Sequence, residues 1–156
     1  MTLDELQRSL AASLAGRQAA PEGCDLRALE RARAALEAKR RRAAQHLLPR
    51  LRAALGAGWD RRFHEHARAY GPAGRLHHVD DAWELAEAIL RERDPQLFPA
   101  AHDDLLALRL RWVRDRRADA DRIRERRGPL VAITRTVPRR LIVRLAGGQG
   151  KVFRIP

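Results

Sequence analysis

The stretch PLVAITRTVPRRLIVRLAGGQGKVFRIP, residues 129–156, decides the fold class of this chain. Its runs are rich in β-branched residues or alternate between apolar and polar residues, and GGQG is typical of a turn. We therefore predict a three-stranded antiparallel meander. Leu141, Val143 and Leu145 point to one face while Ile142 and Arg144 point to the other. We therefore expect one face to pack on the helices that precede the sheet and the other to stay partly exposed to water.

Upstream of the predicted sheet, the apolar residues recur at the three- and four-residue spacing of amphipathic helices. A first helix begins with a capping box of Thr2 and Glu5, a second is capped by Asp25, and Pro49 opens another at its first turn. The chain is therefore expected to be α+β and mainly helical, with a helical domain over residues 1–127 and a C-terminal β-sheet element over residues 128–156.

Two further helices are expected in the middle of the chain. One carries a stripe that we expect to lie in the core, formed by Trp59, Phe63, Ala67 and Tyr70. The next is expected to be capped by Asp80 or Asp81 and to bury Trp83, Ala86, Ile89 and Leu90.

The last predicted helix starts near Pro99 and buries Leu105, Leu106, Leu108, Trp112 and Val113. Beyond it, apolar residues almost vanish from residues 114–128, where Ile123 stands alone. This composition predicts a solvated helical extension or a linker.

The formal net charge of +12 is concentrated in the C-terminal third of the chain. Residues 1–108 carry 17 basic and 16 acidic side chains, whereas residues 109–156 carry 15 basic and 4 acidic ones. Such a field attracts an anionic partner, whether a phosphate backbone, an acidic peptide or a lipid surface.

Several function classes are disfavoured by the sequence. No apolar run approaches the roughly 20 residues of a membrane span, and the N-terminus lacks the order of a signal peptide, so we expect no membrane association and a cytoplasmic protein.

The lone Cys24 excludes an internal disulfide. His64 and His66 lie about 200° apart on a helix and cannot share one ion without help from elsewhere. With no phosphate loop or nucleophile motif, we predict that the chain is not an enzyme.

The arginines around the predicted strands have three interpretations. They can guard exposed edges against aggregation. They can select acidic side chains of a peptide that pairs with the sheet edge as an extra strand. They can also bind nucleic acid, although Phe153 is the only aromatic residue in this element that could stack on bases.

Three stretches of the chain also resemble a known family. They are KRRRAAQHLLPRLRAALGAGWDRRFHEHARAYGPAG at 39–74, DAWELAEAIL at 81–90 and GPLVAITRTVPRRLIVRLAGG at 128–148. In order and spacing they resemble the partner proteins of multinuclear non-heme iron-dependent oxidases, including the partner subunit of methanobactin biosynthesis. The resemblance covers roughly residues 36–156, and LDELQRSLAASLAG at 3–16 looks like the start of related partner proteins.

The resemblance implies a non-catalytic subunit that binds the leader of a ribosomally made precursor peptide by strand addition. A TIM-type barrel oxidase would hold the irons and dock on the helical domain, so no cofactor is expected in this chain. A basic nucleic-acid-binding or regulatory module is the alternative. The peptide-binding residues implied are Val131, Ile133, Arg135, Val137, Arg139, Arg140, Arg144, Lys151, Phe153 and Arg154.

We predict that the purified chain binds neither iron nor zinc stoichiometrically, because its histidines lack ligand spacing and its thiol lacks partners. Elemental analysis of the chain, with the copurified oxidase as the iron-bearing control, checks this. About one metal ion per isolated chain would contradict it.

Overall fold

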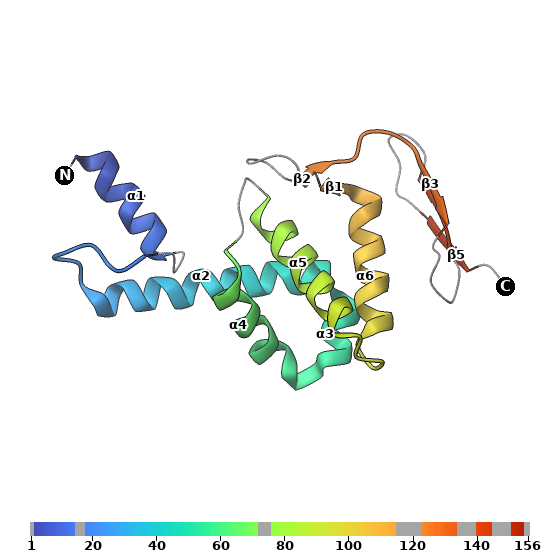
Figure 1. Cartoon of the computed structure of the whole chain (residues 1–156), viewed down its shortest axis with the longest axis horizontal. Coiled ribbons are helices and arrows are strands. Elements are labelled where there is room, and N and C mark those ends of the chain that lie inside the picture. The colour runs from blue at the N-terminus through green and yellow to red at the C-terminus, as the bar shows by residue number, and fades with distance from the viewer. Residues whose placement is uncertain are drawn as a thin grey trace.

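The computed structural model describes residues 2–14, 18–71, 76–114, 123–133, 140–144 and 151–154. As predicted, these residues form a mainly helical body followed by a small antiparallel sheet (Figure 1). The helices are α1 (Leu3–Leu14), α2 (Leu26–Leu47), α3 (Pro49–Leu55), the 3₁₀ turn η1 (Gly56–Gly58), α4 (Trp59–Ala69), α5 (His77–Glu92) and α6 (Phe98–Arg111). The strands are β1 (Trp112–Arg114), β2 (Ile123–Glu125), β3 (Leu130–Ile133), β4 (Arg140–Arg144) and β5 (Lys151–Arg154). Within this described part, no helix is long and apolar enough to cross a membrane.

The predicted starts of α1, α2 and α3 are confirmed. The Thr2 amide donates to the Glu5 carboxylate at 2.7 Å, and the Glu5 amide donates to the Thr2 hydroxyl at 3.3 Å. Asp25 accepts hydrogen bonds from the first turn of α2, and Pro49 occupies the first turn of α3. These caps satisfy amide groups that a helix start otherwise leaves without a partner.

The main core lies where α2, α3, α4, α5 and α6 meet. Its fully buried side chains include Leu48, Leu51, Trp59, Phe63, Leu85, Ile89, Leu105 and Leu108. The predicted aromatic stripe is confirmed for Trp59 and Phe63, with Ala67 packed at the edge. Tyr70 differs, because it lies beyond α4 as an extended C-cap residue and not in the stripe.

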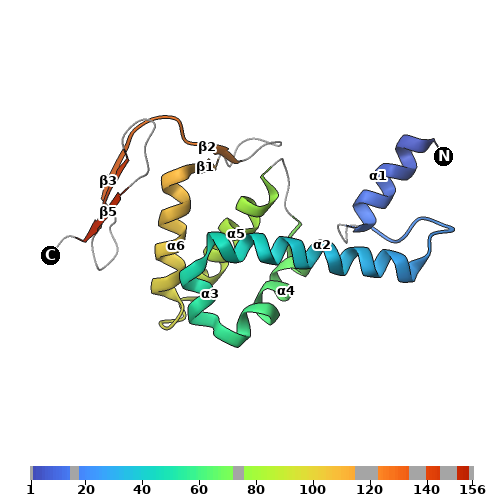
Figure 2. The same cartoon turned by 180° about the vertical axis from the view of Figure 1, so that it is seen from behind.

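The N-terminal half of α2 projects from this core, and α1 packs against it at the far end (Figures 1 and 2). Leucines are exposed along this arm: Leu3 at 70%, Leu10 at 37%, Leu26 at 62% and Leu36 at 39%. The arm therefore contributes little to the main core.

The prediction that Asp80 or Asp81 caps α5 is wrong. The helix begins at His77 with Leu76 as its N-cap, and both carboxylates lie inside the helix, 1% and 0% exposed. The physical reason is that each aspartate pairs with an arginine of another element, as described below.

The prediction of a helical extension or linker over residues 114–128 is wrong where the structure describes it. Trp112 and Val113, expected at the end of the last helix, lie in β1, which pairs antiparallel with β2 so that Trp112 faces Glu125. Ile123 is 7% exposed and joins the main core, which is why the chain turns back here. Residues 115–122 lie outside the described residues.

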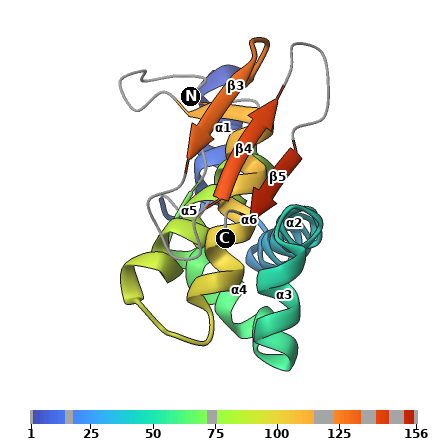
Figure 3. The same ribbon diagram turned by 90° about the vertical axis from the view of Figure 1, so that its right-hand side faces the viewer.

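The C-terminal sheet has the predicted meander order β3-β4-β5 (Figure 3). Leu130 of β3 packs against Leu106 and Leu110 of α6, whereas the next residue, Val131, is 70% exposed. The sheet therefore turns its Leu130 face toward the helical body. The proposed division at residues 127 and 128 stays a prediction.

Candidate functional site

The C-terminal sheet brings together most of the residues expected to bind a peptide. Among them, Arg135, Val137 and Arg139 lie outside the described residues. The others occupy β3, β4 and β5: Val131, Ile133, Arg140, Arg144, Lys151, Phe153 and Arg154.

The register aligns these positions across the three strands. Leu141 pairs with Ile133 on one side and with Phe153 on the other, so positions 133 and 153 are equivalent places on the two outer strands. Arg140 pairs with Arg154. Like charges at directly opposed positions of a sheet are unfavourable, so an anionic group placed beside them would be attracted.

Both outer strands of this sheet offer an edge. In the described part of the chain β3 pairs with β4 alone, and β5 pairs with β4 alone. An outer strand of an antiparallel sheet directs the N–H and C=O of every second residue away from its neighbour. These groups are the hydrogen-bonding partners that an additional strand requires.

A buried ion pair joins α5 to α2, and sequence reasoning missed it. Arg40 donates from Nε to Asp81 Oδ2 at 2.9 Å and from Nη2 to Asp81 Oδ1 at 2.7 Å. Arg40 Nη2 also donates to the Tyr70 carbonyl at 2.9 Å. His66 Nε2 lies 3.6 Å from Asp81 Oδ1, which is too long for a hydrogen bond.

Burial alone would raise the pKa of Asp81, but the hydrogen bonds from Arg40 and the nearby His66 ring outweigh it. The pKa of Asp81 is therefore lowered. A folded pKa below the unfolded value means that the pair stabilises the fold above the unfolded pKa and loses that contribution as the pH falls through the folded pKa.

The neighbouring carboxylate, Asp80, joins α5 to β1. Arg114 Nη2 lies 3.2 Å from Asp80 Oδ1 and 2.5 Å from Glu84 Oε1, and its side chain is 7% exposed. Tyr70 Oη donates to Asp80 Oδ2 at 2.6 Å. Burial, followed by this hydrogen bond, raises the pKa of Tyr70. The cluster holds the strand from which the chain proceeds toward the C-terminal sheet.

A third buried carboxylate, Asp104 of α6, holds the start of α3. Leu48 precedes α3 and has no side chain able to cap it, so Asp104 Oδ2 accepts the Leu51 amide at 2.8 Å. Burial raises the pKa of Asp104 despite the hydrogen bonds from Leu51 and Arg50. All three buried aspartates therefore have structural partners, which favours a scaffold role for them over a catalytic one.

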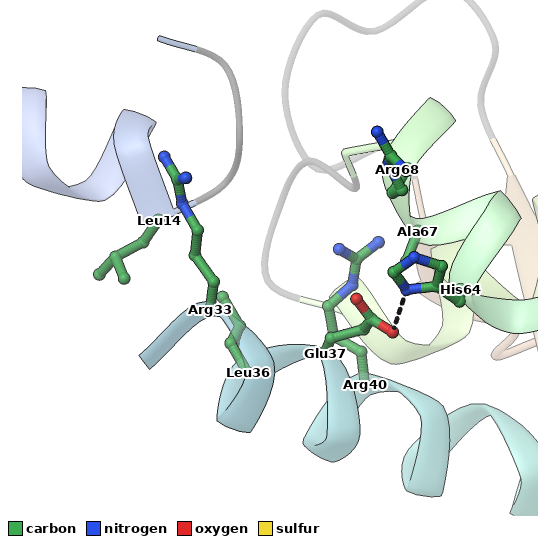
Figure 4. A pocket seen from close by; sticks show the side chains of 8 residues that line it. All are labelled: Leu14, Arg33, Leu36, Glu37, Arg40, His64, Ala67 and Arg68. Carbon is green, nitrogen blue, oxygen red and sulfur yellow. Dashed lines mark hydrogen bonds and ion pairs between the residues drawn. The ribbon is translucent and has the colours of Figure 1, made fainter. Parts of the chain in front are cut away.

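A groove of about 480 Å³ lies over α2 between the end of α1 and α4 (Figure 4). On its floor Arg33 donates to the Ser13 carbonyl at 2.8 Å, and Glu37 Oε1 lies 2.9 Å from His64 Nδ1. Arg68, at the rim, forms no hydrogen bond or ion pair with any described residue. An anion in this groove would be attracted by Arg68 and by the terminal nitrogens of Arg33. Glu37, which lies between the arginines, would repel it at the centre of the groove.

A metal site receives no support from the described residues, in which no three His, Cys, Asp or Glu side chains are grouped to hold an ion. Cys24 is half-buried just before α2. The prediction that the chain binds neither iron nor zinc stoichiometrically is therefore left to elemental analysis.

We expect Asp81→Ala to destabilise the fold by about 3 kcal/mol, because it leaves the largely buried Arg40, whose side chain is 15% exposed, without its counter-charge. The matched control is Asp60→Ala, since Asp60 is 68% exposed and pairs with Arg41 at 3.4 Å. That exposed pair should contribute about 0–1 kcal/mol. Urea unfolding at neutral pH measures both changes.

Urea unfolding repeated at lower pH values checks whether the ionised form of Asp81 is the one that stabilises the fold. The gap between wild type and Asp81→Ala should narrow as the pH falls through the lowered pKa of Asp81. Equal stability losses in the two variants at neutral pH would contradict a structural role for the buried pair.

Comparison with known proteins places this arrangement in a family. A search of curated proteins found no match, and a search of solved structures found none either. Residues 4–91, more than half of the chain, match the family described as SCO6045-like, C-terminal domain. The match runs from α1 to α5 and so contains the Arg40–Asp81 pair and the groove, whereas α6 and all the strands lie outside it. The chain therefore belongs to the SCO6045-like C-terminal domain family.

Proposed function

We propose that this chain is the non-catalytic, leader-binding partner subunit of a multinuclear non-heme iron oxidase that modifies a ribosomally made peptide. The observation that carries the proposal is the C-terminal sheet of three short strands with two open edges in a region of strong positive charge. An edge with unpaired main-chain groups suits an extended peptide, and the surrounding arginines suit acidic side chains.

In this proposal the leader forms a fourth strand on β3 or β5. Main-chain hydrogen bonds to the outer strand supply the affinity, and side chains on the two faces supply the specificity. Since β3 and β5 are each only 4 residues long, the bound strand makes few main-chain hydrogen bonds, so side-chain contacts must contribute to the recognition.

The oxidation itself belongs to the oxidase, whose irons this chain does not supply. By holding the leader while its helical domain docks on the oxidase, the chain would raise the effective concentration of the core peptide at the iron site. This explains how a subunit without catalytic groups can be required for a reaction.

The alternative, a basic nucleic-acid-binding or regulatory module, is favoured by one observation, the excess of 15 basic over 4 acidic residues in 109–156. Charge of this kind binds any polyanion and carries no sequence information by itself. The open strand edges are not needed for that function, so the peptide-binding proposal uses more of what the chain contains.

The proposal is tested first by the genes beside this one and by copurification. We expect a barrel oxidase and a short precursor reading frame as neighbours, and a stable complex of the chain with that oxidase. A neighbouring oxidase that modifies the precursor at full rate without this chain would overturn the proposal.

Strand addition predicts that a proline on the used edge abolishes leader binding. Ile133→Pro and Phe153→Pro each place a proline opposite Leu141, on the two sides of β4. Because the N–H and C=O of Leu141 point toward only one of these two neighbours, one proline removes a donor that faces the open edge and the other removes a donor to β4; both distort their outer strand. Loss of binding in one variant and not in the other identifies the edge, and we expect β3 to be the one used.

The measurement is a titration of the labelled leader with each variant, while circular dichroism confirms that the helices remain. If both variants bind as tightly as the wild type, addition to either edge is excluded.

Leader affinity should also weaken as salt rises, because exposed charge pairs are screened beyond roughly 8 Å at physiological ionic strength. Titrations at two salt concentrations measure this, with duplex DNA of mixed sequence and heparin as comparison ligands. DNA should bind no better than any other polyanion, and a sequence-specific DNA footprint would favour the regulatory alternative.

A further inference from the structure

The contact made by Leu130 shows which face of the C-terminal sheet lies next to the helical body. Leu130 lies against Leu106 and Leu110 of α6, so its face of the sheet is the one next to the helical body. Val131 belongs to the opposite face and is 70% exposed, which makes it one of the most exposed large apolar side chains described. The outer face of the sheet is therefore open at Val131.

The register extends this assignment to the other strands, because directly paired residues and residues two apart in a strand share a face. Val131 pairs with Val143, and Val143 pairs with Lys151. Ile133, Leu141 and Phe153 occupy the next rung of the same face. Five of the six positions on this outer face are thus apolar.

The arginines occupy the other set of positions. Arg144 pairs with Leu130, and Arg140 pairs with Arg154 in the rungs that alternate with those of Val131. The positions on the outer face are therefore mostly apolar, whereas those on the inner face combine the arginines of β4 and β5 with Leu130, Ala132, Ile142 and Val152. A ligand on the β3 edge lies beside Val131 and Ile133 of the outer face and beside Leu130 and Ala132 of the inner face, while the arginine positions of the inner face lie one and two strands further in, on β4 and β5.

The size of the outer face argues for a peptide and against a second copy of the chain. Three strands of about four residues cover roughly 200 Å² at ordinary strand dimensions. A stable protein dimer buries about 800 Å² on each partner. One added strand, in contrast, contacts the edge of this face with only two or three side chains and requires no larger surface.

We propose that the leader is an amphipathic strand in which apolar side chains alternate with acidic ones. This inference rests on the proposed function and names the class of peptide that the site takes. The apolar side chains extend the outer face beside Val131, and the acidic ones lie on the side of the arginine positions. A leader without this alternation would leave either the apolar edge exposed or the cationic face without counter-charge.

Val131 is consequently a specificity-determining residue, and its exposure makes it suitable for a test. Since its side chain is 70% exposed, substitution removes little packing from the free chain. Val131→Asp should weaken leader binding by about tenfold or more, because it places a charge beside apolar side chains, whereas Val131→Thr, which keeps the β-branch, should weaken it by only a few-fold. Leu26→Asp is the matched control, since Leu26 is 62% exposed in the distant arm.

The probe is the leader of the neighbouring precursor, labelled and titrated against the full chain, together with two changed leaders. In one, the alternate apolar residues become serine, and in the other the intervening acidic residues become asparagine. Both changed leaders should bind more weakly, and only the loss caused by asparagine should shrink at high salt.

The outcomes separate this inference from the proposed function. If the wild-type chain binds no leader, both are overturned. If the leader binds the wild type, Val131→Asp and Leu26→Asp equally, the amphipathic strand is excluded while the proposed function stands. If Val131→Asp instead converts a dimer into a monomer in sedimentation without changing leader affinity, the outer face is a contact between copies and the inference is wrong.

Discussion

The helical body depends on two adjacent carboxylates, Asp80 and Asp81, which tie α5 to different elements. Consecutive residues of a helix point about 100° apart, so one can reach α2 and the other β1. Asp81 holds Arg40 of α2 through two hydrogen bonds, and Asp80 holds Arg114 of β1. Buried pairs of this kind add little net stability compared with apolar residues, but each partner is costly without the other. They therefore fix which helix and which strand pack against α5.

The second of these pairs holds β1, which lies between α6 and the C-terminal sheet in the chain. β1 starts directly after α6, and β2 pairs with it and brings Ile123 into the core, so the chain leaves the helical body at a defined place. Leu130 then packs on Leu106 and Leu110, which determines the face that the sheet presents outward.

Features that depend on near neighbours in sequence could be predicted from it. The capping box of Thr2 and Glu5, the helix start at Pro49 and the order of the three strands are local patterns. An aspartate near a helix start is usually a cap. Asp81 is instead buried because it pairs with Arg40, some forty positions earlier in the chain, and such a distant partner cannot be read from the local pattern. The alternation in β4 was visible, but the face that packs depends on α6. The groove was invisible because its lining comes from α1, α2 and α4.

A sheet that leaves an apolar residue such as Val131 exposed on its outer face lacks part of the burial that usually stabilises a small meander. Leu130 supplies a contact with α6, whereas Val131, on the outer face, is 70% exposed. A peptide that pairs with one edge adds main-chain hydrogen bonds and covers part of that face. Because such a ligand binds the folded sheet and not the unfolded chain, it stabilises the sheet in proportion to the logarithm of its concentration. In the proposed function, the sheet that leaves Val131 exposed would therefore have its stability linked to peptide binding.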